Sequence, residues 1–323
     1  MTARRALRRA GAAGPLLLAR AAPALAHEGR ALEPHDLWGA WTWDPALVVP
    51  LVATGIVYAL GVRRLWRRGG VGRGIRRGEA AAFAAGWVTL VLALVSPLHA
   101  LSETLFSAHM AQHTLLLAVA APLLVLGRPM LPFLWALPLG GRRRVGGWGR
   151  RRWLRGPWRA LTRPLPAFAL QAVVLWAWHA PALYDAALAS DAVHALEHAT
   201  FLLSALLFWW SALHVRERGL GYGAGILSTF ATGVHSGALG ALLALAARPL
   251  YPAYAAPPPA WGLTPLEDQQ LAGFIMWMPG GLPYLVAALA LLVAWMQASE
   301  RSVAAWERAV AAERGSAEGW ADA

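Results

Sequence analysis

The stretch AHMAQHTLLLAVAAPLLVL, which runs from Ala108 to Leu126, decides the fold class of this chain. It contains no Asp, Glu, Lys or Arg, and its length is close to the roughly 20 apolar residues that a helix needs to cross a bilayer. Six more apolar stretches occur in the sequence: Pro45–Val62, Ala80–Pro97, Pro166–His179, Val193–His214, Gly225–Ala247 and Gly273–Gln297. We therefore expect an all-α, polytopic membrane protein whose fold is a seven-transmembrane helix bundle.

The composition supports a membrane protein and excludes several other classes. Of the 323 residues, 58% are hydrophobic and only 14% are charged, whereas soluble domains carry about 25% charged residues. The formal net charge of +12 would suit a nucleic-acid-binding protein. The arginines are confined to short segments between apolar stretches, however, so we expect the lipid bilayer and no nucleic acid as a partner. The chain has no cysteine, so a metal site must use imidazole, thioether or carboxylate ligands.

The arginines also predict the orientation of the chain in the membrane. Residues 63–77 and 142–163, which follow the first and third apolar stretches, are strongly basic, and the segment after the fifth stretch carries Arg216 and Arg218. The segments after the second, fourth and sixth stretches contain one arginine in total, Arg248. Because positively charged loops remain in the cytoplasm, we expect the amino end outside and the carboxyl end in the cytoplasm.

The two ends of the chain differ from the membrane domain in composition. Residues 1–26 combine four early arginines with a short apolar segment and the small-x-small sequence Ala24-Leu25-Ala26, which is typical of a signal peptide and its cleavage site. A cytoplasmic tail is the alternative interpretation of this segment. We expect an outer amino-terminal segment at 27–44, the seven-helix membrane domain at 45–298 and a cytoplasmic tail at 299–323.

Histidines gather at the predicted outer ends of three apolar stretches. His109 and His113 are four residues apart, His194 and His198 have the same spacing, and His179 ends the fourth stretch. Four residues are about one helical turn, so each pair projects from one side of its helix. Polar side chains are costly inside a membrane, and ionisable residues there are functional candidates. We therefore take these five histidines as candidate metal ligands.

Thioethers and carboxylates lie at the same predicted level as the histidines. Met110 is adjacent to His109, and Met276 and Met278 fall in the outer part of the seventh stretch. Imidazole with thioether suits copper, and thioether favours Cu(I). We therefore add Met276 and Met278 as candidate ligands. Met110, Glu197 and Asp268 are expected to have supporting roles near the ligands. Glu197 is placed in this group because its side chain projects about 100° away from that of His198 on a helix.

Three sequence blocks resemble the seven-span CtaG family of cytochrome c oxidase assembly factors, first associated with caa-type oxidases. They are His109-Met110-Ala111-Gln112-His113 through Pro129, Trp178-His179-Ala180-Pro181 followed by His194–His198, and Asp268–Gly273 with Met276-Trp277-Met278-Pro279-Gly280-Gly281. The resemblance covers about Pro45 to Gln297. It implies a multi-pass protein of the bacterial cytoplasmic (inner) membrane without enzymatic activity. The implied partners are cytochrome c oxidase subunits, especially the copper-bearing extracytoplasmic subunit.

The leading hypothesis is therefore an assembly factor that binds copper, as Cu(I), near the outer membrane face and helps form the oxidase copper centre. One alternative is a copper transporter or copper-tolerance protein, which would use His235 in the sixth stretch as an inward step. A second is a haem-binding membrane protein, with His113 and His198 as axial ligands. A third is a zinc enzyme, because His194, Glu197 and His198 fit a His-x-x-Glu-His pattern.

Overall fold

The computed structural model describes residues 32–149, 151–214, 221–254 and 259–321. The chain divides into two compact units, Met1–Arg30 and Ala31–Ala323, and every described residue belongs to the second unit. The predicted signal peptide, residues 1–26, therefore lies outside the described residues.

All regular structure in the described residues is helical, and these residues contain no strand, which confirms the expected all-α class. The α-helices are α1 (Pro45–Gly69), α2 (Arg77–Leu94), α3 (Pro97–Ser102), α4 (Phe106–Thr114), α5 (Ala121–Leu126), α6 (Met130–Ala136), α7 (Leu139–Trp148), α8 (Arg152–Leu161), α9 (Pro164–Trp178), α10 (Pro181–Ala189), α11 (Asp191–Leu213), α12 (Tyr222–Ala244) and α13 (Pro265–Ala321). The π-helical turn η2 (Leu115–Ala120) joins α4 to α5, and short 3-10 turns lie at η1 (Leu37–Gly39), η4 (Pro252–Tyr254) and η5 (Pro259–Trp261).

Within the described residues, six helical segments are long and apolar enough to cross a membrane, and a bent pair of helices makes a seventh if it is counted as one span. The six are Pro45–Gly69, Arg77–Leu94, Phe106–Leu126, Asp191–Leu213, Tyr222–Ala244 and Pro265–Ala311. The pair is α8 and α9, which meet at an angle of 71°. Pro164 begins α9, and a proline cannot continue the hydrogen bonding of a preceding helix. The predicted seven-span bundle is thus recovered when α8 and α9 form one span.

The third span is one continuous helix with a π-helical turn in its middle. Its first part, α4, carries His109 and His113, and η2 begins two residues after His113. Pro122, in the first turn of α5, has no N–H to donate to the preceding turn, and such a missing bond is a usual cause of local irregularity in a helix. The π-helical turn changes the rotation between the two halves, and such turns often occur at functional sites.

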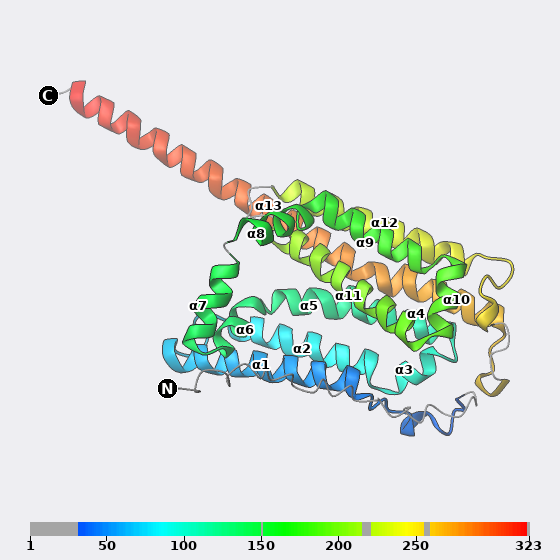
Figure 1. The fold of residues 1–323 in the computed structure, drawn as a ribbon. Helices are drawn as coiled ribbons and strands as arrows, with labels where there is room; N and C mark the ends of the chain where they lie inside the picture. The colour runs from blue at the N-terminus through cyan, green and yellow to red at the C-terminus, as the bar shows by residue number, and fades with distance from the viewer. Residues whose placement is uncertain (1–31, 150, 215–220, 255–258, 322–323) are drawn as a thin grey trace, which may run out of the picture. The chain divides into compact units, whose positions relative to one another are not determined.

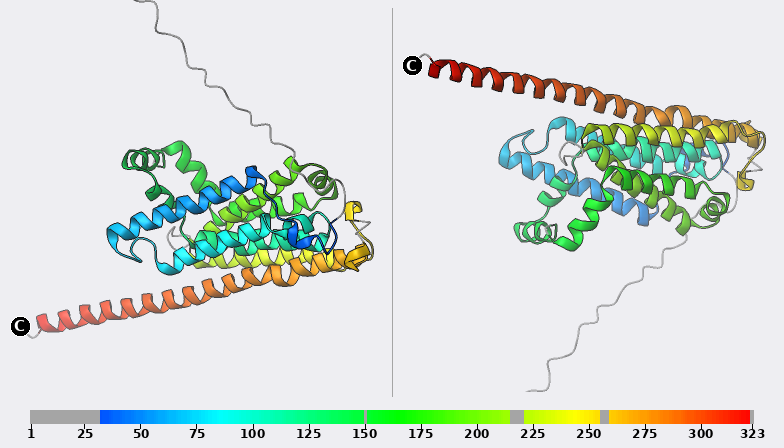
Figure 2. Two further views of the ribbon diagram at one scale, coloured as in Figure 1. Left: turned by 90° about the horizontal axis from the view of Figure 1, so that it is seen from below. Right: turned by 90° about the horizontal axis from the view of Figure 1, so that it is seen from above.

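The spans run side by side, and α3 and α10 lie together at one end of the bundle, with α7 and α8 at the other (Figures 1 and 2). The helices α12 and α13 pack closely because glycine faces glycine: a Cβ atom added to Gly240 would lie 2.7 Å from the carbonyl oxygen of Gly273. Small residues at such contacts are how membrane helices approach each other. The carboxyl-terminal part of α13 continues well beyond the bundle (Figure 2).

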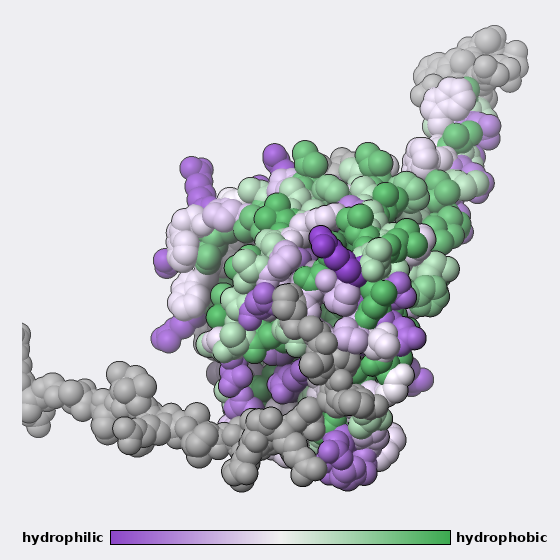
Figure 3. Space-filling model, turned by 90° about the vertical axis from the view of Figure 1, so that its right-hand side faces the viewer, coloured by the Kyte–Doolittle hydropathy of each residue, from purple (hydrophilic) through white to green (hydrophobic). Residues whose placement is uncertain are grey.

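The sides of the bundle are apolar, as a membrane protein requires. Val173, Leu203 and Leu227 are 66%, 61% and 68% exposed on three different spans, and contiguous apolar surface of this kind needs lipid or a partner. Viewed from the end that carries α3 and α10, hydrophilic residues occur among the apolar ones (Figure 3). The spans enclose polar side chains near this end, and those side chains form the candidate site.

Candidate metal centre

Two helices from distant parts of the sequence bring four histidines together. The rings of His109 and His113 come from α4, and those of His194 and His198 come from α11. The ring centroids of His109 and His194 are 5.5 Å apart, and those of His113 and His198 are 5.3 Å apart. His109 is fully buried, while His113 and His194 are 3% and 8% exposed. Each histidine of α4 therefore faces one of α11 across the contact between the spans.

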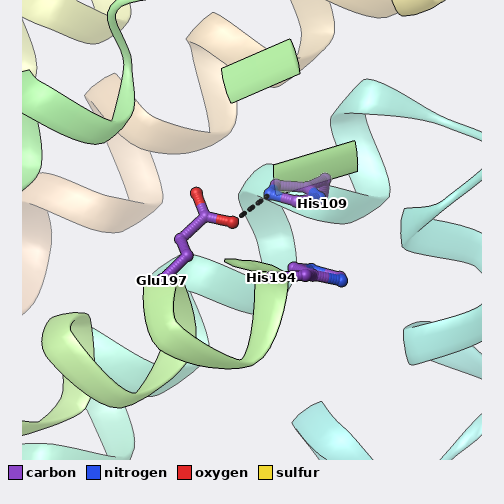
Figure 4. Close-up of side chains that lie close together, drawn as sticks. All are labelled: His109, His194 and Glu197. Atoms are coloured by element: carbon purple, nitrogen blue, oxygen red, sulfur yellow. Dashed lines mark ion pairs between the residues drawn. The ribbon is translucent and has the colours of Figure 1, made fainter. Parts of the chain in front are cut away.

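A carboxylate lies among these imidazoles. Glu197 is fully buried on α11, and its Oε2 atom lies 3.8 Å from Nε2 of His109 while its Oε1 atom lies 3.8 Å from Nε2 of His113. Figure 4 shows the carboxylate directed at His109, with the ring of His194 beside it. We expected Glu197 to have only a supporting role, but the structure places its carboxylate at the centre of the cluster.

In the part of the chain that the structure describes, the His, Asp and Glu ligand atoms form two groups of three. Atoms of His109, His194 and Glu197 lie within 4.8 Å of one another, and so do atoms of His113, Glu197 and His198. The Nε2 atoms of all four histidines and both carboxylate oxygens are buried and make no hydrogen bond. Buried polar atoms are normally paired, and a buried charge normally has a partner or binds a metal. This donor set therefore fits a cation.

A thioether and a further imidazole adjoin the cluster. His179 follows the last residue of α9, and its Nδ1 atom lies 2.7 Å from the carbonyl oxygen of Leu175, to which it donates in the neutral tautomer. Its Nε2 atom then has a free lone pair, 3.4 Å from the sulfur of Met110. The His179 ring centroid is 6.4 Å from that of His113. The predicted supporting residue Met110 thus lies against a predicted ligand.

Asp268 holds the helix that carries two of the histidines. Its carboxylate oxygens accept hydrogen bonds from the backbone N–H groups of Phe106 at 2.7 Å and Ser107 at 3.0 Å, which are the first residues of α4. A carboxylate at this place also interacts favourably with the helix dipole. Asp268 therefore positions α4, and with it His109 and His113.

A tyrosine from the segment before α13, Tyr254, lies beside the Nδ1 atom of His109. The hydroxyl of Tyr254 donates to the carbonyl oxygen of Ser102 at 2.8 Å and lies 3.5 Å from Nδ1 of His109. Burial raises the pKa of Tyr254, which keeps the hydroxyl protonated. Histidines that bind metals commonly donate their second N–H to such a partner. This contact leaves Nε2 of His109 free to face Glu197.

His99 of α3 also belongs to this neighbourhood, although it is not among the candidate ligands named from the sequence. Its ring centroid lies 5.8 Å from that of His194 and 6.3 Å from that of His198. The side-chain nitrogen of Gln112 donates to Nδ1 of His99 at 3.1 Å and to the carbonyl oxygen of Ala93 at 2.7 Å. Burial lowers the pKa of His99, and the nearby His109 lowers it further, so the ring stays neutral. Its position at the same predicted membrane level was the one available signal.

Met276 is buried beside Gly240 of α12 and belongs to the same core cluster as Met110, whereas Met278 is 56% exposed. The role of these two thioethers as ligands stays a prediction. Nδ1 of His235 lies 3.4 Å from the indole nitrogen of Trp176, between α12 and α9.

The residues of the cluster lie within a region of the sequence that matches one protein family. A sequence model described as cytochrome c oxidase caa3 assembly factor (Caa3_CtaG) matches residues 56–298. The chain belongs to this family. The match confirms the resemblance predicted from the three sequence blocks, and it spans every residue of the histidine cluster described above.

Curated relatives of this CtaG family member occur in mycobacteria. The chain is 29% identical over 272 residues to uncharacterized protein Mb0105 of Mycobacterium bovis and to uncharacterized protein MT0111 of Mycobacterium tuberculosis. It is 27% identical over 269 residues to uncharacterized protein ML1998 of Mycobacterium leprae. Each alignment covers 81% of this chain but only 40% of the relative, so the chain spans less than half the length of these proteins. No solved structure matches the chain.

Proposed function

We propose that this protein binds copper in the histidine cluster and supplies it to the copper-bearing extracytoplasmic subunit of cytochrome c oxidase, in the cytoplasmic membrane of a bacterium. Membership of the oxidase assembly factor family supports the assembly role. A non-catalytic role accords with that membership. The carboxyl end is then cytoplasmic, as the arginines predict, and the histidine end of the bundle faces outward, where an extracytoplasmic partner can reach it.

One observation carries the metal-binding part of the proposal. The buried Glu197 carboxylate has two oxygens without a hydrogen bond and lies 3.8 Å from Nε2 of both His109 and His113, which also lack hydrogen-bond partners. In an apolar interior this arrangement costs free energy unless a cation binds or a proton is taken up. Bound copper would supply the missing partners of these atoms.

The choice of copper rests on the softer ligands beside the carboxylate. Imidazole binds copper, zinc and iron alike, but the thioether of Met110, 3.4 Å from Nε2 of His179, favours Cu(I). The position of the cluster also suits the release of a bound ion. The cluster adjoins the loop that carries Tyr254, at one end of the bundle, and does not lie in the middle of the bundle. The copper itself is the cargo, and the chain orients its ligands and excludes water.

The alternatives receive less support from the arrangement of side chains. A haem between His113 and His198 would need space that the rings of His109 and Phe201 occupy, with centroids 4.2 Å and 4.6 Å from that of His113. A transporter would need polar groups continuing from the cluster, whereas His235 contacts Trp176 and Phe168 instead. Zinc remains a competitor for the same ligands, because two histidines and a glutamate are also a common zinc set.

The assembly role is tested in cells that lack this protein and carry either the wild type or the His109→Ala/His113→Ala variant. We expect the oxidase purified from variant cells to retain its haem but to contain less copper than oxidase from wild-type cells. The Met296→Leu variant is the matched control, because that side chain is 54% exposed on α13 and is not a candidate ligand. Oxidase with full copper content in the histidine variant would contradict the proposed function.

A further inference from the structure

The ligand atoms are arranged for more than one ion. Those that lie within 4.8 Å of one another form two groups of three, and not one group of five. Each group pairs one histidine of α4 with one of α11: His109 with His194, and His113 with His198. The two histidines of each helix are four residues apart, which is a rise of about 6 Å along the axis. The groups are therefore stacked along the bundle, one helical turn from each other.

Glu197 is the residue that both groups share. Its two oxygens are divided between the groups, since Oε2 is 3.8 Å from Nε2 of His109 and Oε1 is 3.8 Å from Nε2 of His113. A carboxylate that served one ion would direct both oxygens, or its nearer oxygen, at one group. The equal distances instead describe a carboxylate positioned to bridge, as in two-metal sites whose ions lie about 3.5–4 Å apart.

A single ion would leave half of the cluster without partners. If one cation bound to His109, His194 and Glu197, both ring nitrogens of His113 and Nε2 of His198 would still make no hydrogen bond. His113 is only 3% exposed, so water does not solvate its ring freely. An ion bound to His113, His198 and Glu197 would likewise leave Nε2 of His109 and Nε2 of His194 without a partner. Two ions pair the Nε2 atoms of all four histidines and both carboxylate oxygens.

We propose that this cluster is a two-copper centre in which the Glu197 carboxylate bridges an ion held by His109 and His194 and an ion held by His113 and His198. This inference rests on the proposed function, because it takes copper as the metal bound. It deepens that function by giving the protein a cargo of two ions. The ring centroid of His179 lies 6.4 Å from that of His113 in the second group, and its Nε2 atom lies 3.4 Å from the sulfur of Met110.

The test is a titration of the full-length, detergent-purified protein with Cu(I) in competition with a chelator of known affinity. We expect two copper ions per chain for the wild type and one for His109→Ala and for His113→Ala. Glu197→Gln removes the charge of the bridge but keeps its size, and we expect it to bind fewer than two. Met296→Leu is the control and should bind two. Size-exclusion profiles and helical content report whether each variant is folded.

A spin count on the wild type decides the matter even if a variant does not fold. Protein loaded with Cu(II) should give an electron paramagnetic resonance signal that accounts for much less than its total copper, because bridged ions couple magnetically. One copper per wild-type chain, or two coppers with a full spin count, would overturn the bridged two-copper centre while leaving copper binding intact. No copper in the wild type would instead overturn the proposed function itself.

Discussion

Replacement of Asp268 by alanine should unfold the amino-terminal end of α4 and destabilise the protein. The carboxylate is 1% exposed and accepts hydrogen bonds of 2.7 Å and 3.0 Å from the N–H groups of Phe106 and Ser107, which are themselves 1% and 5% exposed. Hydrogen bonds to charged groups contribute about 1.5–3 kcal/mol each. Because the variant loses two such bonds and leaves both donors buried, we expect it to lose about 3–6 kcal/mol of unfolding free energy.

Unfolding in detergent micelles, followed by circular dichroism as the denaturing detergent fraction is raised, measures this loss. Asp268→Asn keeps one acceptor oxygen and should lose about half as much as Asp268→Ala. Glu300→Ala removes an exposed carboxylate from the same helix and should leave the stability unchanged. Since α4 carries His109 and His113, the Asp268→Ala protein should also bind copper more weakly. An Asp268→Ala variant within 1 kcal/mol of the wild type would refute this role for the carboxylate.

Three further predictions concern helix packing and metal binding. Gly273→Ala would place a Cβ atom against the backbone of Ala244, so we expect α12 and α13 to separate and the protein to lose about 1–3 kcal/mol of stability; Gly281→Ala, which meets no atom, should be neutral in the same unfolding assay. Met110→Leu should weaken Cu(I) binding but leave Zn(II) binding intact, and equal losses for both metals in parallel titrations would contradict a thioether contact. Copper binding should weaken as the pH falls, because protons compete for the imidazole nitrogens, and a pH-independent affinity would argue against histidine ligation.

The fold class could be predicted from the sequence because the length and apolarity of a span are local properties. The fourth apolar stretch, Pro166–His179, is likewise recovered as α9, which has 15 residues and meets α8 at an angle of 71°. The later part of α13 remains helical to Ala321. Its mixed charge and high alanine content suit a helix without requiring a bilayer around it.

The composition of the site was predicted only in part, because it depends on which spans are neighbours. The four-residue spacing predicted that each histidine pair shares one side of its helix, but it did not predict that α4 faces α11. The expected supporting role of Glu197 has the same cause. The helical periodicity gives the direction of its side chain relative to His198 on α11, but it does not show that α4 occupies the space toward which that side chain points. The contributions of His99 and Tyr254 come from a short helix and a loop, whose positions no periodicity in the sequence specifies.

The central claim is that the converging histidines bind copper, and metal content tests it most directly. The measurement compares the wild type with His109→Ala/His113→Ala, both purified in detergent and loaded with Cu(I) under reducing conditions, together with their optical spectra. The account predicts bound copper in the wild type, its loss in the variant, and no Soret band in either protein. Copper absent from both proteins, or retained fully by the variant, would contradict it.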